Sequence, residues 1–290
     1  MSSSPAKQRR TISAPIIWLR SPAPLDPGAR RLTIGQAIAV VGLVYLAYCG
    51  WPTVAAVHAM GQPSSPVTDW WSALTDALPL LGILLATAPS YGLLVYWLRA
   101  RRSTAGLPWQ APTEPAKTTY ILAVGLMLAM TLVYGSLIPH TGASPLASWP
   151  AVAAATIRLG YSSVVEELVV VAVPTLALTH ARAPRWAIVA TAMLLRGPYH
   201  LYHGWYALAW AAVWSGGLAL LFLTFRRLLP LISAHMASNT IILGASLSPI
   251  LLPHPLMFAL AIVILVPTAF WTAMRYTRAT TRERRPDSCR

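Results

Sequence analysis

The chain has 290 residues, of which 56% are hydrophobic and 10% are charged, and its formal net charge is +14 at pH 7. A soluble domain carries about 25% charged residues, so this composition excludes an ordinary soluble globule, and the apolar content excludes a disordered chain. The two cysteines, Cys49 and Cys289, exclude a disulfide framework and a cysteine-based zinc site. The chain is therefore expected to lie in a membrane, where positive charge orients it rather than binding nucleic acid.

Eight apolar stretches follow one another, most of them near the length that a helix needs to cross about 30 Å of hydrocarbon. They predict helices over residues 35–57, 74–98, 119–138, 151–178, 186–202, 205–225, 230–247 and 255–274. Because the stretches are apolar on all sides and do not alternate with period two, they favour helices over barrel strands. The predicted fold class is all-α, a polytopic membrane protein with about eight transmembrane helices.

The basic residues alternate between the two ends of these predicted helices. All but two of the 22 Lys and Arg residues lie before the first stretch, in every second loop, or after the last stretch. Membrane proteins retain positive charge on the cytoplasmic side. The pattern therefore predicts an even number of crossings with both termini in the cytoplasm.

The same pattern divides the chain into five parts. Residues 1–33 are expected to be a flexible, basic cytoplasmic tail, and 34–148 to hold scaffold helices. Residues 149–247 hold the candidate catalytic helices, 248–275 the last transmembrane helix, and 276–290 a second basic tail. The first tail lacks the apolar segment of a cleaved signal peptide, and membrane lipid is an expected partner of the protein.

Ionisable side chains inside a membrane cost about 2.5–3.5 kcal/mol each on insertion scales, and here they gather in neighbouring stretches. Glu166 and Glu167 lie deep in the fourth stretch, together with Arg158, and Arg196 lies in the fifth. His200 follows Arg196 by four residues, which predicts that both share one helical face. A structural ion pair is the alternative to a functional site.

Two further polar residues, His235 and Asn239, are four residues apart on the seventh stretch. A carboxylate and an imidazole can together activate a water molecule, and a second imidazole with an amide can bind an oxyanion. The set predicts a hydrolase that needs no Ser or Cys nucleophile. The same Glu and His residues could instead hold zinc, although the HExxH spacing of soluble zinc proteases is absent.

These residues resemble the motifs of the CPBP intramembrane proteases, which include the type II CAAX prenyl endopeptidases. The family pattern is a Glu-Glu-x-x-x-Arg helix, a Phe-x-x-x-His helix and a His-x-x-x-Asn helix. The corresponding motifs here, within residues 150–245, are Glu166-Glu167, Arg196-Gly-Pro-Tyr-His200 and His235-x-x-x-Asn239. Three such motifs in order inside apolar helices are more specific than any one of them.

The resemblance implies a role for each of the five motif residues. Glu166 and His200 would activate the attacking water. His235 and Asn239 would bind the oxyanion, and Glu167 would support the site.

The chain departs from the family pattern at two positions. Val171 stands where the family has its Arg, and Arg196 where it has its Phe, which is similar to a subgroup common in high-GC bacteria. Two adjacent carboxylates at membrane depth need a cation, so we expect Arg196 to pair with Glu167. Arg158 is the other candidate to support the carboxylates.

The leading hypothesis is an intramembrane endopeptidase, of the glutamate or the metallo type, in a bacterial plasma membrane. It would cleave a peptide or protein substrate near the cytoplasmic face. The water mechanism requires no cofactor, and zinc is the alternative. Two other functions stay open: a proton-coupled transporter, since proton relays also use intramembrane Glu and His residues, or a non-catalytic scaffold or immunity protein.

Overall fold

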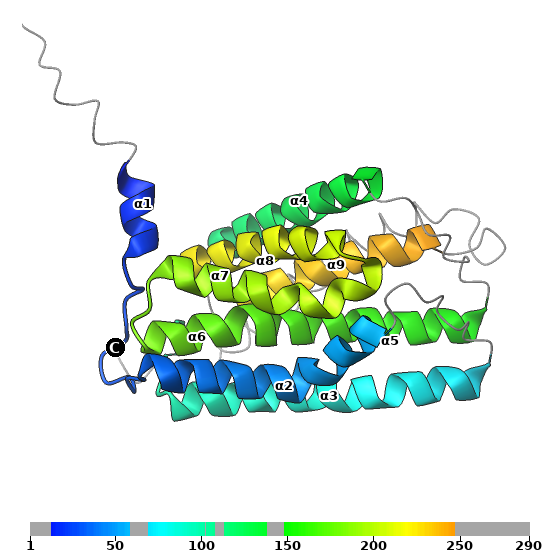
Figure 1. Ribbon diagram of the computed structural model, residues 1–290, viewed down its shortest axis with the longest axis horizontal. Coiled ribbons are helices and arrows are strands. Elements are labelled where there is room, and N and C mark those ends of the chain that lie inside the picture. Colours follow the sequence, from blue (N-terminus) through cyan, green and yellow to red (C-terminus); the bar gives the residue numbers. More distant parts are fainter. Residues whose placement is uncertain (1–12, 59–68, 102, 108–112, 138–147, 247–290) are drawn as a thin grey trace, which may run out of the picture.

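The computed structural model describes residues 13–58, 69–101, 103–107, 113–137 and 148–246, and these ranges form helices and no strand. The helices are α1 (Ser13–Arg20), α2 (Ile34–His58), α3 (Trp70–Trp97), α4 (Thr113–Leu137), α5 (Trp149–Glu166), the π-helix η2 (Glu167–Ala172), α6 (Val173–His180), α7 (Arg185–Arg196), the 3₁₀ helix η3 (Pro198–His203), α8 (Tyr206–Phe225) and α9 (Leu228–Ser246). The longer helices lie side by side in an elongated bundle, and α1 projects from one end (Figure 1). The all-α prediction is confirmed.

Seven of the predicted spans coincide with helices, and the eighth, residues 255–274, lies outside the described residues. Four segments are long and apolar enough to cross a membrane by length and composition. They are Ile34–His58, Trp70–Trp97, Trp149–His180 and Tyr206–Phe225. The protein is therefore a multi-pass membrane protein with several shorter apolar helices beside these spans.

The fourth predicted span is the centre of the bundle. It is a continuous helical segment of 32 residues, Trp149–His180, made of α5, η2 and α6. Of its most apolar window, 89% is buried inside the protein, against 17% for α2 and for α3. The helices α2, α3, α8 and α9 pack around it. Because its neighbours shield it from lipid, this segment can hold ionisable side chains at lower cost than a lipid-facing helix.

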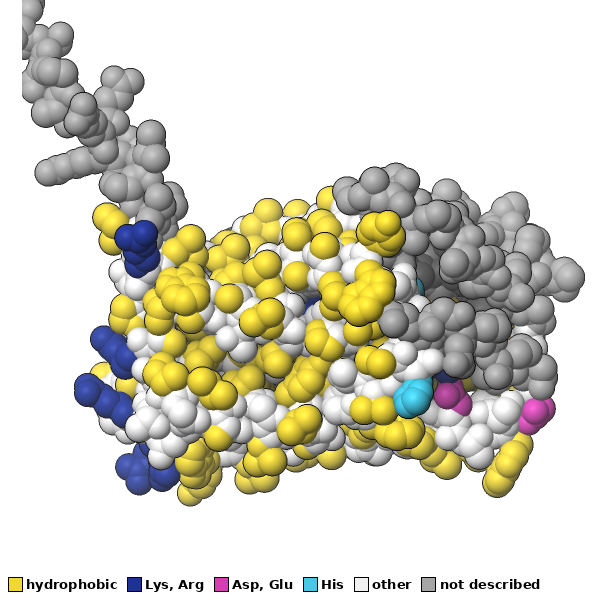
Figure 2. Space-filling model, in the orientation of Figure 1, with side chains coloured by type: hydrophobic (Ala, Val, Ile, Leu, Met, Phe, Trp, Pro, Cys, Tyr) yellow, Lys and Arg dark blue, Asp and Glu magenta, His cyan; other side chains and the backbone are white. Residues whose placement is uncertain are grey.

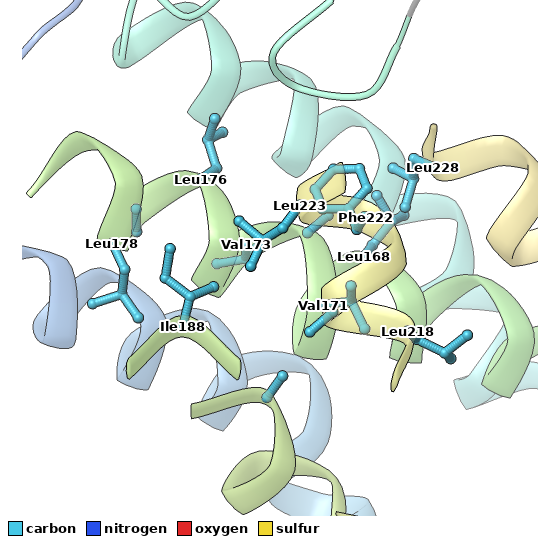
Figure 3. Close-up of a cluster of buried hydrophobic side chains, with 14 of the residues drawn as sticks. Leu168, Val171, Val173, Leu176, Leu178, Ile188, Leu218, Phe222, Leu223 and Leu228 are labelled. Carbon is cyan, nitrogen blue, oxygen red and sulfur yellow. The ribbon is translucent and has the colours of Figure 1, made fainter. Parts of the chain in front are cut away.

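An apolar core fixes the position of the π-helix against α8. Leu168 and Val171 of η2 lie in one buried cluster with Leu218 and Phe222 of α8 (Figure 3). Val171, the position where the family pattern has Arg, is fully buried in this cluster. The side chain there contributes packing and no charge.

Basic side chains gather at the end of the bundle from which α1 projects (Figure 2). Backbone hydrogen bonds join the segments at this end: the N–H of Arg30 donates to the Leu98 carbonyl at 2.9 Å, and that of Leu32 to the His180 carbonyl at 3.0 Å. The alternate basic loops thus meet at one end, as the charge pattern requires. The assignment of this end to the cytoplasm stays a prediction.

The prediction of a flexible tail over residues 1–33 is wrong for its second half. The helix α1 packs on α7, where Arg185 Nη1 donates to the Trp18 carbonyl at 2.9 Å and the guanidinium lies over the Trp18 ring. The carboxylate of Asp26 accepts hydrogen bonds from the Arg101 N–H and the Thr104 hydroxyl. The Ser-, Pro- and Arg-rich composition predicted a solvated tail because composition does not reveal these tertiary contacts.

Candidate active site

The two adjacent carboxylates lie where the central segment changes from an α-helix to a π-helix. Glu166 is the last residue of α5, and Glu167 is the first residue of η2. Neighbouring residues of an α-helix point about 100° apart, yet both side chains are buried here, Glu166 being 7% exposed and Glu167 0%. Single-turn π-helices within α-helices are rare and are frequent at functional sites. This irregularity therefore marks the Glu pair as the centre of the candidate site.

Arg196, the last residue of α7, is the cation of the Glu pair. Its Nη2 donates to Glu167 Oε1 at 2.8 Å, and its Nε lies 3.7 Å from Glu166 Oε2. The Arg196 side chain is 0% exposed. The expected ion pair between Arg196 and Glu167 is therefore present, and the cation comes from the neighbouring helix.

His235 of α9 is bound to the same carboxylate. Its Nδ1 lies 2.9 Å from Glu167 Oε1, so one oxygen of Glu167 accepts from both Arg196 and His235. The hydrogen on Nδ1 leaves Nε2 as an acceptor in the neutral ring and as a donor in the protonated ring. Two carboxylates and one guanidinium leave one negative charge, which a single proton on His235 or Glu166 neutralises.

His200 lies in the 3₁₀ helix η3, directly after α7. The expectation that it shares a continuous helix with Arg196 is wrong, because α7 ends at Arg196, before Pro198. His200 Nδ1 donates to the Arg196 carbonyl at 3.0 Å, which leaves the lone pair of Nε2 in the neutral ring. Among the described residues no direct hydrogen bond joins His200 to Glu166, so joint action of the two requires a bridging water.

Asn239 of α9 ties its helix to α5. Its Nδ2 donates to the hydroxyls of Ser162 and Ser163, each at 3.0 Å, and lies 3.3 Å from the Leu159 carbonyl. Both amide hydrogens are therefore committed to α5. The resemblance implies that this amide binds the oxyanion. In the arrangement described here, neither amide hydrogen is free to do so.

Arg158 does not support the Glu pair. It forms an ion pair with Asp76 of α3, and both side chains are exposed. Arg158 precedes Glu166 by eight residues, which is about 12 Å along the helix axis. Of the two basic candidates, the structure brings only Arg196 to the carboxylates.

Two aromatic residues of the site were missed. The Trp214 ring of α8 packs against Arg196, whose guanidinium carbon is 4.4 Å from the ring centroid, and against His235, at 4.9 Å between centroids. Tyr199 of η3 is buried beside His200, with ring centroids 4.7 Å apart, and its hydroxyl lies near the Glu166 carboxylate. An indole within an apolar helix is normally packing, so the sequence carried no signal for Trp214. The position of Tyr199 directly before His200 was the available signal.

Six buried polar atoms of this cluster have no hydrogen-bond partner among the residues that the structure describes. They are Glu166 Oε2, Glu167 Oε2, Arg196 Nε, Arg196 Nη1, the Tyr199 hydroxyl and Trp214 Nε1. Buried polar groups in proteins are nearly always hydrogen-bonded to protein or to water. The cluster is thus built to bind polar atoms, both donors and acceptors, at membrane depth.

The donors of this cluster do not fit a zinc site. The described part of the chain contains no group of three or more His, Cys, Asp or Glu side chains placed to hold one metal ion. Glu167 Oε1 is occupied by Arg196 and His235, and Nδ1 of His200 by a backbone carbonyl. The arrangement therefore does not support the zinc alternative.

Comparison with known proteins gives one family. Residues 147–241 match the model described as type II CAAX prenyl endopeptidase Rce1-like. The match covers about a third of the chain, runs from the start of α5 into α9 and includes every residue of the cluster. No curated protein and no solved structure matches the chain.

Proposed function

We propose that the chain is an intramembrane endopeptidase, because residues 147–241 match the Rce1-like type II CAAX prenyl endopeptidase model. The observation that supports the proposal most is the buried cluster of Glu166, Glu167, Arg196 and His235. A cluster of this kind costs too much at membrane depth to be kept for packing alone. Hydrolysis by an activated water needs the groups that it contains.

In the proposed mechanism Glu166 is the general base. Its Oε2 makes no hydrogen bond among the described residues and lies 3.7 Å from Arg196 Nε. Glu166 takes a proton from water while the water oxygen attacks the substrate carbonyl carbon. Nε2 of His200 accepts the second hydrogen bond of that water. When the carbon–nitrogen bond breaks, the proton on Glu166 passes to the leaving amine.

Glu167 acts through its partners rather than on the substrate. Its Oε1 fixes the guanidinium of Arg196 and the Nδ1–H of His235 at the same point. With a proton on Nε2, His235 donates to the oxyanion, and its positive charge balances the second carboxylate. Asn239 is a positioning residue in this scheme, since its amide holds α9 against α5.

We infer that the site lies near mid-depth of the bundle, deeper than the cleavage near the cytoplasmic face that was expected from the sequence. Trp214 follows the start of α8 by eight residues and precedes its end by eleven, or about 12 Å and 17 Å along the axis. The scissile peptide bond must therefore enter the membrane. We propose a membrane-associated peptide or protein as the substrate, and the plasma membrane of a bacterium as the location.

The test compares the newly formed protein termini in membranes of cells that express the wild type or Glu166→Gln. Termini produced by the wild type should be absent with Glu166→Gln. The matched control is Asp76→Asn, which makes the same chemical change at an exposed carboxylate outside the cluster. Identical termini in all three would refute the hydrolase proposal. Loss of proton-linked flux in place of cleavage would indicate a transporter, and no change of any kind a scaffold.

A further inference from the structure

Trp214 lies at the centre of the polar cluster, although no motif includes its helix. Its ring contacts the Arg196 guanidinium, stands perpendicular to the His235 ring and lies 5.9 Å from the His200 ring between centroids. The side chain is 6% exposed. The residues that surround it come from α7, η3 and α9, so α8 lies where the Arg196–His200 motif meets the His235–Asn239 motif.

The indole N–H of Trp214 is a buried donor without a partner. Within the described part of the chain Nε1 makes no hydrogen bond, and the indole nitrogen can only donate. A buried unsatisfied donor costs about 1–3 kcal/mol, and Trp and Tyr usually find a partner when they are buried. Trp210, one helical turn earlier, follows this rule: its Nε1 donates to the Met130 carbonyl at 3.0 Å.

The proposed mechanism lacks a second donor for the oxyanion. A tetrahedral intermediate is best stabilised by two or more preorganised donors. His235 can supply one through Nε2, but the Asn239 amide is committed to Ser162 and Ser163. The indole of Trp214 is an unused neutral donor beside the His235 ring, with ring centroids 4.9 Å apart.

We propose that the Trp214 indole N–H donates a hydrogen bond to the carbonyl oxygen of the scissile peptide, beside Nε2 of His235. This inference rests on the proposed hydrolase function and adds a catalytic residue to it. The indole gains and loses no proton, so the proton transfers among water, Glu166 and the leaving amine are unchanged. Its contribution is to stabilise the negative charge that forms on the oxygen.

The packing of α8 holds Trp214 in one place, as a preorganised donor requires. The next residue, Ser215, donates from its hydroxyl to the Ala192 carbonyl of α7 at 2.8 Å. Gly216 follows, and a Cβ at that position would come within 3.0 Å of Met193. Small residues let neighbouring helices approach closely in membranes. Here Ser215 and Gly216 allow α8 to pack closely against α7 immediately after Trp214.

The experiment removes the N–H and keeps the ring, by placing 3-benzothienylalanine at position 214. The probe is a synthetic peptide spanning a cleavage site found in the comparison of wild type and Glu166→Gln. We expect kcat to fall by about 10²–10³-fold with little change in KM, because the bond forms fully only in the transition state. The same replacement at Trp210 is the matched control. It removes an indole N–H bonded to the backbone, and kcat should stay within a few-fold of the wild type.

Wild-type kcat with 3-benzothienylalanine at position 214 would overturn the proposal, and so would a rise in KM alone. Glu166→Gln is measured in parallel, and if it stays active the hydrolase proposal itself fails. A structure of the wild type in lipid at high resolution gives a test that needs no substrate. A water or ligand oxygen within about 3.2 Å of Nε1 is expected, and an aromatic face or hydrocarbon at that atom would contradict the assignment.

Discussion

Removing the guanidinium of Arg196 should leave an uncompensated carboxylate inside the membrane. Arg196 and Glu167 are both 0% exposed and are joined at 2.8 Å, so water and salt screen the pair little. Breaking such a pair from one side costs about 3–5 kcal/mol, whereas exposed pairs contribute about 0–1 kcal/mol. We therefore expect Arg196→Met, which keeps a long side chain of similar shape, to destabilise the protein by about 3–5 kcal/mol.

The assay is thermal unfolding of the purified protein in detergent and in lipid nanodiscs. For a chain of this size 1 kcal/mol corresponds to roughly 2 °C, so Arg196→Met should lower Tm by about 6–10 °C. The double variant Arg196→Met/Glu167→Gln removes both charges and should recover most of this loss, because a neutral pair needs no compensation. Both variants should lack cleavage activity, since the orientation of Glu166 and His235 is lost in each.

Two results would refute this reasoning. If Arg196→Met lowers Tm by no more than an exposed control such as Arg158→Gln, the ion pair is not what holds the cluster. If the double variant is no more stable than Arg196→Met, the cost does not arise from the unpaired Glu167 carboxylate.

Four further outcomes follow from the same structure. Adding Val171→Arg to Arg196→Met should lower Tm further and restore no activity, because position 171 is fully buried in the apolar cluster with Leu218 and Phe222; recovery of either property would contradict this. Asn239→Ala should lower Tm by cutting the tie to Ser162 and Ser163, and should reduce kcat less than Glu166→Gln does. Arg158→Gln should change stability by about 1 kcal/mol or less and leave cleavage intact, since its pair with Asp76 is exposed. Cysteines placed at Ser144 and Ser103 should be labelled from outside and from the cytoplasm, respectively; the reverse would overturn the topology.

The helices and the cation could be predicted because both follow from the cost of placing polar groups in hydrocarbon. That cost confines charged residues to loops, so the apolar stretches matched helices α2 to α9 closely. The same cost required a partner for Glu166 and Glu167 once Val171 had replaced the family Arg. Arg196 was the better placed of two candidates, and it forms the pair.

The geometry of the site could not be predicted. When a helix is apolar on all sides, its sequence does not show which face points into the protein. Around Glu166 almost every residue of the central segment is buried, so periodicity cannot show which face the carboxylates share or where the π-helix interrupts the register. The same uniformity hid Trp214, since an indole amid apolar residues is normally packing. Only contacts between helices distinguish it from Trp210, whose N–H is already bonded.

The irregular helix ends explain why the site forms where it does. Hydrocarbon cannot hydrogen-bond to a free backbone group, so an interruption of the helical ladder inside the membrane must be satisfied by the protein. The chain interrupts α7 at Arg196, before Pro198, and the carbonyl released there accepts the Nδ1–H of His200. That bond fixes the tautomer in which Nε2 can accept a hydrogen bond from water. The His200 side chain thus supplies a hydrogen bond to the Arg196 carbonyl, which the end of α7 leaves without its helical partner. The same hydrogen bond orients the imidazole of the proposed catalytic His.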